Sequence, residues 1–92
     1  MADFVVGAIV AEDTFSNPLS IRGGQFNFSL WGTFVATVVV QRSFDQGVTW
    51  LDVDTFTAPT EEIGMDATGA LYRAGVKTGA FTSGTVNVRL SQ

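Results

Sequence analysis

The sequence predicts an all-β domain, a small antiparallel β-sandwich of jelly-roll or immunoglobulin-like kind with about six to eight short strands. Runs of β-branched and aromatic residues recur at spacings of roughly ten residues along the chain. Glycine, proline, asparagine and aspartate mark turns between these runs. No segment of useful length has the apolar period of an amphipathic helix, which favours a sandwich or small barrel over a helical fold.

Residues 1–24 form a first segment, an N-terminal arm or an edge strand followed by a loop, and residues 25–92 form the sandwich domain. Residues 3–11 (DFVVGAIVA) are apolar and rich in β-branched side chains, which favours a strand. The alternative is an extended arm that packs on a neighbouring subunit. A loop follows, with one short edge strand at residues 19–22.

Strict alternation marks residues 25–31 (QFNFSLW) and predicts a half-buried strand with Phe26, Phe28 and Leu30 facing the core. Residues 34–42 follow after a turn and are apolar on both faces. A strand of that kind lies at the centre of a sheet, or its outer face is covered by another chain.

The firmest structural prediction is a hairpin with arms at residues 34–42 and 49–56, joined by a polar turn at residues 43–47 (SFDQG). A period of two should divide the side chains of the second arm between two faces. One face would carry Leu51, Val53 and Thr55, and the other Trp50, Asp52 and Asp54.

The remaining elements are a weak strand at residues 61–65, a turn at 66–69, a strand at 70–76, a connection at 77–84 and a closing strand at 85–90. Alternation in the last two of these strands predicts two further sets of side chains that each share one face. They are Tyr72, Ala74 and Val76 in the first, and Val86, Val88 and Leu90 in the second.

The composition argues against several functions. The chain has no cysteine and no histidine, so it lacks disulfides, thiolate metal sites and the commonest general base. The five basic residues are scattered and the net charge is −4, which argues against nucleic-acid binding. No apolar run is long enough to cross a bilayer, and we expect no secretory signal. The missing cysteines fit synthesis in a cytoplasm.

A domain of 92 residues buries only about 60% of the surface that its unfolded chain exposes, so its own core gives modest stability. Without disulfides, support from oligomerisation or from docking on a larger assembly is expected. Apolar residues make up 46% of the chain and charged residues 15%. This composition suggests that other chains cover part of the surface.

The turn carries the pattern S-x-D-x-G-x-T-W, formed by Ser43, Asp45, Gly47, Thr49 and Trp50. Asp45 can accept backbone N–H groups within the turn, and Gly47 can adopt a positive φ without strain. The hydroxyl groups of Ser43 and Thr49 can close the turn. The pattern resembles the Asp box of sialidase-type propeller blades, which implies a structural turn away from any active site. A single copy does not predict a propeller.

Other interpretations of the acidic residues have less support. Asp45, Asp52 and Asp54 could form a calcium cluster, but the chain lacks an acidic binding loop with a distal glutamate, and a solvated strand face is the simpler interpretation. The neighbouring acids Glu61, Glu62 and Asp66 could supply a carboxyl pair for glycoside hydrolysis, but such a pair must flank a substrate cleft, for which a small sandwich leaves little room. A Ser–Lys pair using Lys77 has no motif around it. We therefore expect no enzyme and no cofactor.

Exposed aromatic residues would allow sugar binding. Trp31, Trp50 and Tyr72, with the phenylalanines, could stack against a carbohydrate, although aromatic side chains in a sandwich more often belong to the core or an interface. A carbohydrate-binding module for host attachment is therefore an alternative function.

The order of several segments resembles a family of small virion proteins of tailed bacteriophages. The segments are WGTFVATV (residues 31–38), VQRSFDQGVTW (40–50), FTAPTE (56–61), LYRAGVKTG (71–79) and SGTVNVRLSQ (83–92). The resemblance covers about three quarters of the chain and leaves out residues 1–24. It implies a structural protein, with no catalytic residues to carry over.

The expected function is therefore that of a capsid decoration or cement protein, made in the host cytoplasm and bound to the major capsid protein on the outer surface of the virion. We expect a homo-oligomer, with a trimer favoured, and no partner nucleic acid or membrane. The residues expected to contact the capsid or another subunit are Phe4, Val5, Val6, Ile9 and Val10. The alternatives are a component of the tail, neck or fibre and the carbohydrate-binding module.

Overall fold

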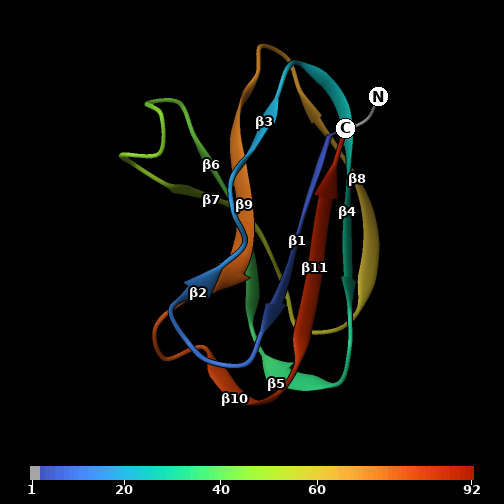
Figure 1. Cartoon of the computed structure of the whole chain (residues 1–92), viewed down its shortest axis with the longest axis vertical. Coiled ribbons are helices and arrows are strands. Elements are labelled where there is room, and N and C mark those ends of the chain that lie inside the picture. The colour runs from blue at the N-terminus through green and yellow to red at the C-terminus, as the bar shows by residue number, and fades with distance from the viewer. Residues whose placement is uncertain (1–2) are drawn as a thin grey trace.

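The computed structural model describes residues 3–92 and shows two antiparallel sheets packed face to face (Figure 1). The first sheet has the strand order β1-β11-β4-β8, and the second has the order β2-β9-β6-β7, with β3 also paired to β9. The predicted all-β sandwich is confirmed, with more strands than expected. The strands are β1 Phe4–Ile9, β2 Thr14–Phe15, β3 Leu19–Ile21, β4 Gly24–Trp31, β5 Phe34–Ala36, β6 Val38–Ser43, β7 Leu51–Phe56, β8 Thr60–Asp66, β9 Ala70–Val76, β10 Phe81–Gly84 and β11 Val86–Ser91.

The core lies between the two sheets and comes from the strands with the clearest alternation. Removing these apolar side chains from water is the main stabilising contribution to the fold. Strands β4, β9 and β11 each place the predicted set of side chains inward, because successive residues of a strand point to opposite faces. The buried residues from these three strands are Phe26, Phe28, Leu30, Tyr72, Ala74, Val76, Val86, Val88 and Leu90.

The predicted strand at residues 34–42 is two strands rather than one. Phe34–Ala36 (β5) pairs with Phe81–Gly84 (β10) in a small separate sheet, and Val38–Ser43 (β6) lies between β9 and β7. Thr37 separates them and donates its backbone N–H to Ala80 O at 2.9 Å. Residues on both sides of Thr37 are of the same apolar type, and only the strands they pair with differ. The composition therefore gave no sign of the break. Strand β6 is buried on both faces, as expected of a central strand.

Strand β7 does not follow the predicted alternation, because its register against β6 shifts between Val40 and Gln41. Asp54 pairs with Val40 and Asp52 pairs with Gln41, so Val53 is an extra residue on the β7 side of the ladder. Val40 belongs to the core, whereas Gln41 binds groups on the outer face. The bulge therefore separates Asp52 and Asp54, which the sequence pattern had assigned to one face.

Two short strands were not expected from the sequence. Strand β2 has only two residues and β10 has four, and both lie within segments rich in turn-forming residues. Strand β2 pairs with the longer strand β9, and β10 pairs with β5, so both short strands are defined by their partners across the ladder. Residues 3–92 contain no helix long and apolar enough to cross a membrane.

Candidate functional site

The turn between β6 and β7 is held by one hydroxyl and one carboxylate. Ser43 Oγ donates to Asp45 Oδ1 at 2.7 Å and accepts the backbone N–H groups of Gly47 at 2.9 Å and Asp45 at 3.4 Å. Asp45 Oδ1 also accepts the backbone N–H of Thr49 at 2.8 Å. Gln46 and Gly47 have φ angles of 64° and 89°, a conformation that glycine adopts without steric cost. The side chains thus replace the ladder hydrogen bonds that a turn cannot make.

The charge on Asp45 is stabilised by the same contacts. The backbone N–H of Thr49, followed by the hydroxyl of Ser43, lowers the pKa of Asp45 to about 2. The carboxylate accepts these hydrogen bonds best when it is ionised, so the turn favours the charged form. These bonds lie within the turn itself, as expected for a structural element.

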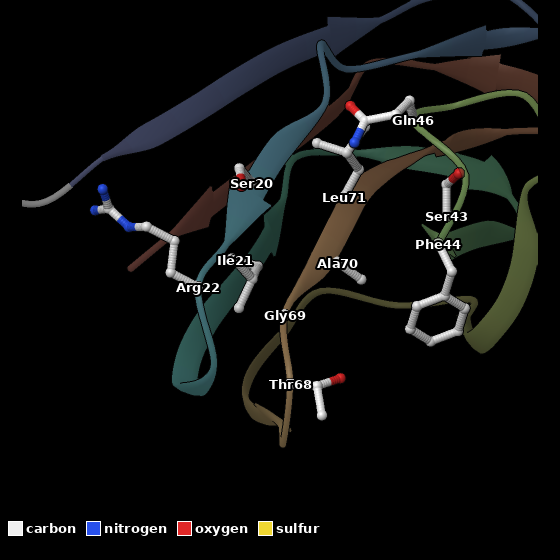
Figure 2. Close-up of a pocket in the computed structure, with 10 residues that line it drawn as sticks. All are labelled: Ser20, Ile21, Arg22, Ser43, Phe44, Gln46, Thr68, Gly69, Ala70 and Leu71. Carbon is white, nitrogen blue, oxygen red and sulfur yellow. The ribbon is translucent and has the colours of Figure 1, made fainter.

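A hollow of about 430 Å³ lies beside this turn (Figure 2). Its walls come from the turn, from β3 and from the start of β9, and Arg22 is the only residue among those lining it with an ionisable side chain. Acid–base chemistry needs at least one more group that can give or take a proton. The hollow therefore provides no catalytic arrangement among the described residues.

Arg73 forms the centre of a second polar arrangement, on the outer face of the β2-β9-β6-β7 sheet. Its guanidinium carbon lies 4.0 Å from the ring centroid of Phe15 and 4.3 Å from that of Trp50. Arg73 Nε donates to Gln41 Oε1 at 2.9 Å, and Gln41 Nε2 donates to Asp52 Oδ1 at 2.9 Å. Cation–π stacking and hydrogen bonds thus connect four strands across the sheet.

Lys77 completes this network through an ion pair with Asp52. The hydrogen bond from Lys77, followed by that from Gln41, lowers the pKa of Asp52. Lys77 is therefore engaged with a carboxylate, and a Ser–Lys catalytic pair is not formed. Sequence reasoning did not find this network, because its members are neighbours only across strands. The one available signal was that Arg73 alternates with the inward-facing Tyr72 and Ala74.

The acidic residues do not gather into a metal site or a hydrolytic pair. Asp45 serves its turn, Asp52 and Asp54 are separated by the bulge, and residues 3–92 hold no group of three or more histidine, cysteine or acidic side chains that could bind a metal ion. Glu61 and Glu62 follow each other on β8 and bind Ser29 and Thr60 respectively. The calcium alternative therefore has no geometric support among residues 3–92, and Glu61 and Glu62 point to opposite faces of the sheet because they are successive residues of β8.

Asp66 differs from the other acids because it is buried. Its Oδ2 accepts a hydrogen bond from the Tyr72 hydroxyl at 2.7 Å, and its Oδ1 accepts the backbone N–H groups of Thr68 and Gly69. The bond from Tyr72 is the largest cause of a lowered pKa for Asp66, against the opposing effect of burial. Its hydrogen-bonding capacity is used in holding the β8–β9 turn against the core.

The aromatic side chains do not form one platform. Tyr72 is 1% exposed and lies in the core, whereas Trp31 is 45% exposed on the outer face of the β1-β11-β4-β8 sheet. Trp50 stacks on Arg73 at the other sheet. Trp31, Trp50 and Tyr72 therefore lie in three different environments, and of these three Trp31 has the exposed ring. Two phenylalanines, Phe4 and Phe44, are also exposed.

The expected contact residues lie on β1 and, for Val10, directly after it, and they divide between the two faces of the sheet. Ile9 is 1% exposed and belongs to the core, and Val5 packs against that core from a partly buried position. Phe4, Val6 and Val10 are between 55% and 66% exposed. The segment forms six consecutive residue pairs with β11, so it is a strand of the domain's own sheet in this structure.

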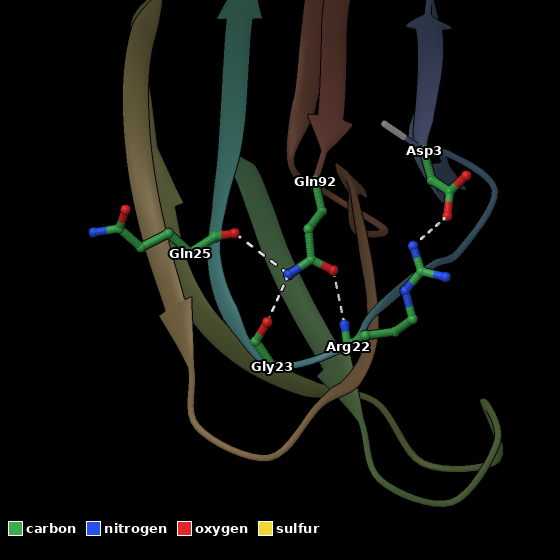
Figure 3. Close-up of polar contacts among 5 residues, drawn as sticks. All are labelled: Asp3, Arg22, Gly23, Gln25 and Gln92. Atoms are coloured by element: carbon green, nitrogen blue, oxygen red, sulfur yellow. Dashed lines mark hydrogen bonds and ion pairs between the residues drawn. The ribbon is translucent and has the colours of Figure 1, made fainter. Parts of the chain in front are cut away.

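A polar cluster fixes the end of this sheet (Figure 3). Asp3 and Gln92 exchange backbone hydrogen bonds at 3.1 and 2.9 Å, and Asp3 Oδ2 pairs with Arg22 Nη2 at 3.0 Å. Gln92 Oε1 accepts the backbone N–H of Arg22, and Gln92 Nε2 donates to the carbonyl oxygens of Gly23 and Gln25. The cluster joins the beginning of β1 to the end of β11 and to the β3–β4 turn.

Five of the exposed large apolar side chains lie on one face of the β1-β11-β4-β8 sheet. They lie on its outer face and are Phe4, Val6, Trp31, Ile63 and Met65, which we call the outer-face set. Phe4 and Val6 lie at the β1 edge and Ile63 and Met65 at the β8 edge, with polar side chains of β11 and β4 between them. Exposed apolar side chains of this kind can mark a protein–protein contact surface. Comparison of the chain with protein-family models, curated proteins and solved structures finds no match.

Proposed function

We propose that the protein is a non-enzymatic structural component of a tailed-phage virion, a capsid decoration protein that binds the major capsid protein on the outer surface of the head, as a trimer. The outer-face set is the observation that carries the proposal. Its side chains are 45% to 73% exposed, and burying them against another chain would contribute favourable free energy. The segments that resemble small virion proteins extend from the end of β4 to residue 92. This resemblance is the reason for proposing a phage particle as the assembly that the protein joins.

Repetition on a symmetric shell strengthens the physical argument. A small contact per subunit gives weak binding, but a trimer that engages three sites at once binds far more tightly through its raised effective concentration. A surface with few charges and several exposed apolar side chains suits this mode of attachment, because each contact costs little polar desolvation.

The first test is the copy number of the protein in purified particles of the phage that encodes it, measured by quantitative mass spectrometry against the major capsid protein. Copies in the hundreds support decoration of the shell. A few copies to a few dozen contradict shell decoration and support a position in the neck, tail or fibres. Complete absence from particles contradicts a virion role.

A second test uses particles that lack the protein and purified variants added back to them. Ile63→Ser removes an outer-face side chain that is 73% exposed, and Val48→Ser is the matched control, since Val48 is 83% exposed but lies in the β6–β7 turn. We expect loss of binding for the first variant only. Equal binding of both variants would exclude the outer face as the capsid contact.

A carbohydrate-binding module is the second candidate, and the exposed ring of Trp31 is the observation that favours it. Aromatic rings that are open to solvent can stack on the apolar face of a sugar. Binding to a glycan array that disappears in Trp31→Ala, with an unchanged circular dichroism spectrum, would support this function. Absence of binding by the unmodified protein would exclude it for the sugars on the array.

A further inference from the structure

Strand β1 is an edge strand with no protection against pairing. Its sequence, FVVGAI, contains no charged residue and no proline, and its register against β11 runs without a bulge from Phe4 to Ile9. Charged side chains, prolines and bulges are the usual devices that prevent an edge strand from pairing with another chain. Their absence here makes β1 a template for an additional strand.

Within residues 3–92, the ladder shows which backbone groups of β1 point away from their neighbouring strand. Asp3 and Gln92 exchange both of their backbone hydrogen bonds, so they form a hydrogen-bonded pair. Because such pairs alternate along an antiparallel ladder, Phe4, Val6 and Ala8 direct their N–H and C=O groups away from β11. All three residues are exposed, with side chains on the outer face of the sheet.

The same alternation can be followed across β11 and β4 to the opposite edge. A residue of β11 whose backbone groups bond to β1 has none directed towards β4, so its neighbours in sequence make the bonds to β4. The same rule applies between β4 and β8, and the three registers show which residues of β8 bond to β4. On β8 this alternation leaves Glu61, Ile63 and Met65 with N–H and C=O groups directed outward. These side chains also lie on the outer face and are exposed.

We propose that copies of this chain join edge to edge, with β8 of one copy paired to β1 of the next. The sheet has four strands that alternate in direction, so a second copy placed in the same orientation brings its β1 antiparallel to β8. The free backbone groups then face each other. One register places Ile63 opposite Val6, Met65 opposite Phe4 and Glu61 opposite Ala8, which covers apolar side chains from both edges.

Charge favours this pairing over the two symmetric ones. A β8–β8 contact would bring Glu61 and Glu62 towards their own counterparts, and like charges that face each other across strands are destabilising. A β1–β1 contact would bring Arg89, which is level with Val6 on the neighbouring strand, towards its counterpart. Pairing β8 with β1 instead places Glu61 of one copy beside the edge next to Arg89 in another. The same register brings Asp3 opposite Asp66, but each of these carboxylates has a partner in its own copy, Arg22 for Asp3 and Tyr72 for Asp66.

The interface is heterologous, so it produces a closed ring or an open chain rather than a two-fold dimer. This interface would be the contact that holds the proposed trimer together, so its role in the virion rests on the proposed function. The strand edges themselves do not depend on a phage particle. Self-association can therefore fail while particle binding holds, and particle binding can fail while self-association holds.

Proline substitution tests the interface with little disturbance of the domain. Val6→Pro and Ile63→Pro each remove an N–H that points outward, so neither removes a hydrogen bond of the chain's own ladder. Val6→Thr and Ile63→Thr are the controls, because they keep the N–H. Mass would be measured by sedimentation velocity at concentrations up to the order of 1 mM, since a single strand contact is small and gives weak association. Circular dichroism would check each fold.

We expect the unmodified protein and both threonine variants to form trimers or larger species as concentration rises, and each proline variant to stay monomeric. A mixture of the two proline variants should form a one-to-one dimer that grows no further, because one supplies an intact β8 and the other an intact β1. This dimer would also show that both variants fold. A monomeric unmodified protein, association of either proline variant alone, or no dimer in the mixture would overturn the proposal.

Discussion

The hydroxyl of Tyr72 donates a 2.7 Å hydrogen bond to Asp66 Oδ2 inside the sandwich. Tyr72 is 1% exposed and Asp66 is 4% exposed, so neither polar group has much access to water. Each provides the other with a hydrogen-bond partner. The bond links the end of β8 to the middle of β9. Burial, followed by the bond to Asp66, raises the pKa of Tyr72, and Tyr72 is the largest cause of the lowered pKa of Asp66.

Replacing Tyr72 with phenylalanine should destabilise the domain. The variant keeps the ring that packs against Phe26, with the two ring centroids 4.6 Å apart. It leaves the buried Asp66 without one of its hydrogen bonds. A buried polar group that loses a partner costs about 1–3 kcal/mol in the free energy of unfolding. Urea denaturation followed by circular dichroism measures this change. In the Asp66→Ala background, which has no acceptor for the hydroxyl, the same substitution should cost less, and equal costs in both backgrounds would show that the bond contributes nothing.

Acid should weaken the β6–β7 turn through Asp45. Its pKa is about 2 in the folded chain and about 3.9 in an unfolded one. A carboxyl group whose folded pKa is lowered contributes stability that is fully present above its unfolded pKa and is lost as pH falls through its folded pKa. The melting temperature should therefore fall between about pH 4 and pH 2.

The variant Asp45→Asn isolates this contribution. Asparagine cannot titrate, so the melting temperature of the variant should be lower at pH 7 and should depend less on pH over that interval. The lowered pKa of Asp66 acts in the same direction, so part of the acid sensitivity should remain in the variant. Identical pH profiles for the variant and the unmodified protein would contradict the role given to Asp45.

A methyl group at Gly64 should not fit. A Cβ placed there would collide with the ring of Phe26, which fills the space under the middle of β8. Adding a methyl group to a packed site forces side chains or backbone to shift and costs about 1–3 kcal/mol. Gly64→Ala should lower the free energy of unfolding by this amount, as measured in urea. Phe26→Leu should absorb part of the cost, so the double variant should be more stable than the sum of the single effects implies.

Arg73→Lys should loosen the outer face of the second sheet. Lysine keeps the charge but loses the planar stacking between Phe15 and Trp50 and the Nε bond to Gln41. We expect a loss of about 1 kcal/mol in the free energy of unfolding. We also expect a red shift of Trp50 fluorescence, measured in a Trp31→Phe background. Arg89→Lys is the control, because Arg89 stacks on the exposed Phe4, with its guanidinium carbon 5.1 Å from the ring centroid. An equal effect of both substitutions would contradict a special role for the stack.

The sequence predicted what depends on neighbours along the chain. Alternation identified the inward faces of β4, β9 and β11, and the motif at Ser43 and Asp45 marked the turn that these residues hold. It could not predict what depends on neighbours across strands. The bulge at Val53, the change of sheet at Thr37 and the stack around Arg73 are all set by which strands pair, and pairing leaves no local signal in the composition.

Deleting residues 2–11 should unfold the domain. This experiment tests whether the segment is a strand that the domain needs or an arm that it does not need. The deletion removes six residue pairs with β11 and the buried side chain of Ile9. Loss of such a side chain alone costs about 2–5 kcal/mol, and whole domains are stable by only about 5–15 kcal/mol. Circular dichroism should therefore show loss of the β spectrum. The double variant Phe4→Ser/Val6→Ser is the control, since it changes only exposed side chains and should stay folded. A folded deletion variant would mean that the core does not need β1, and the segment would then act as an arm available to another subunit.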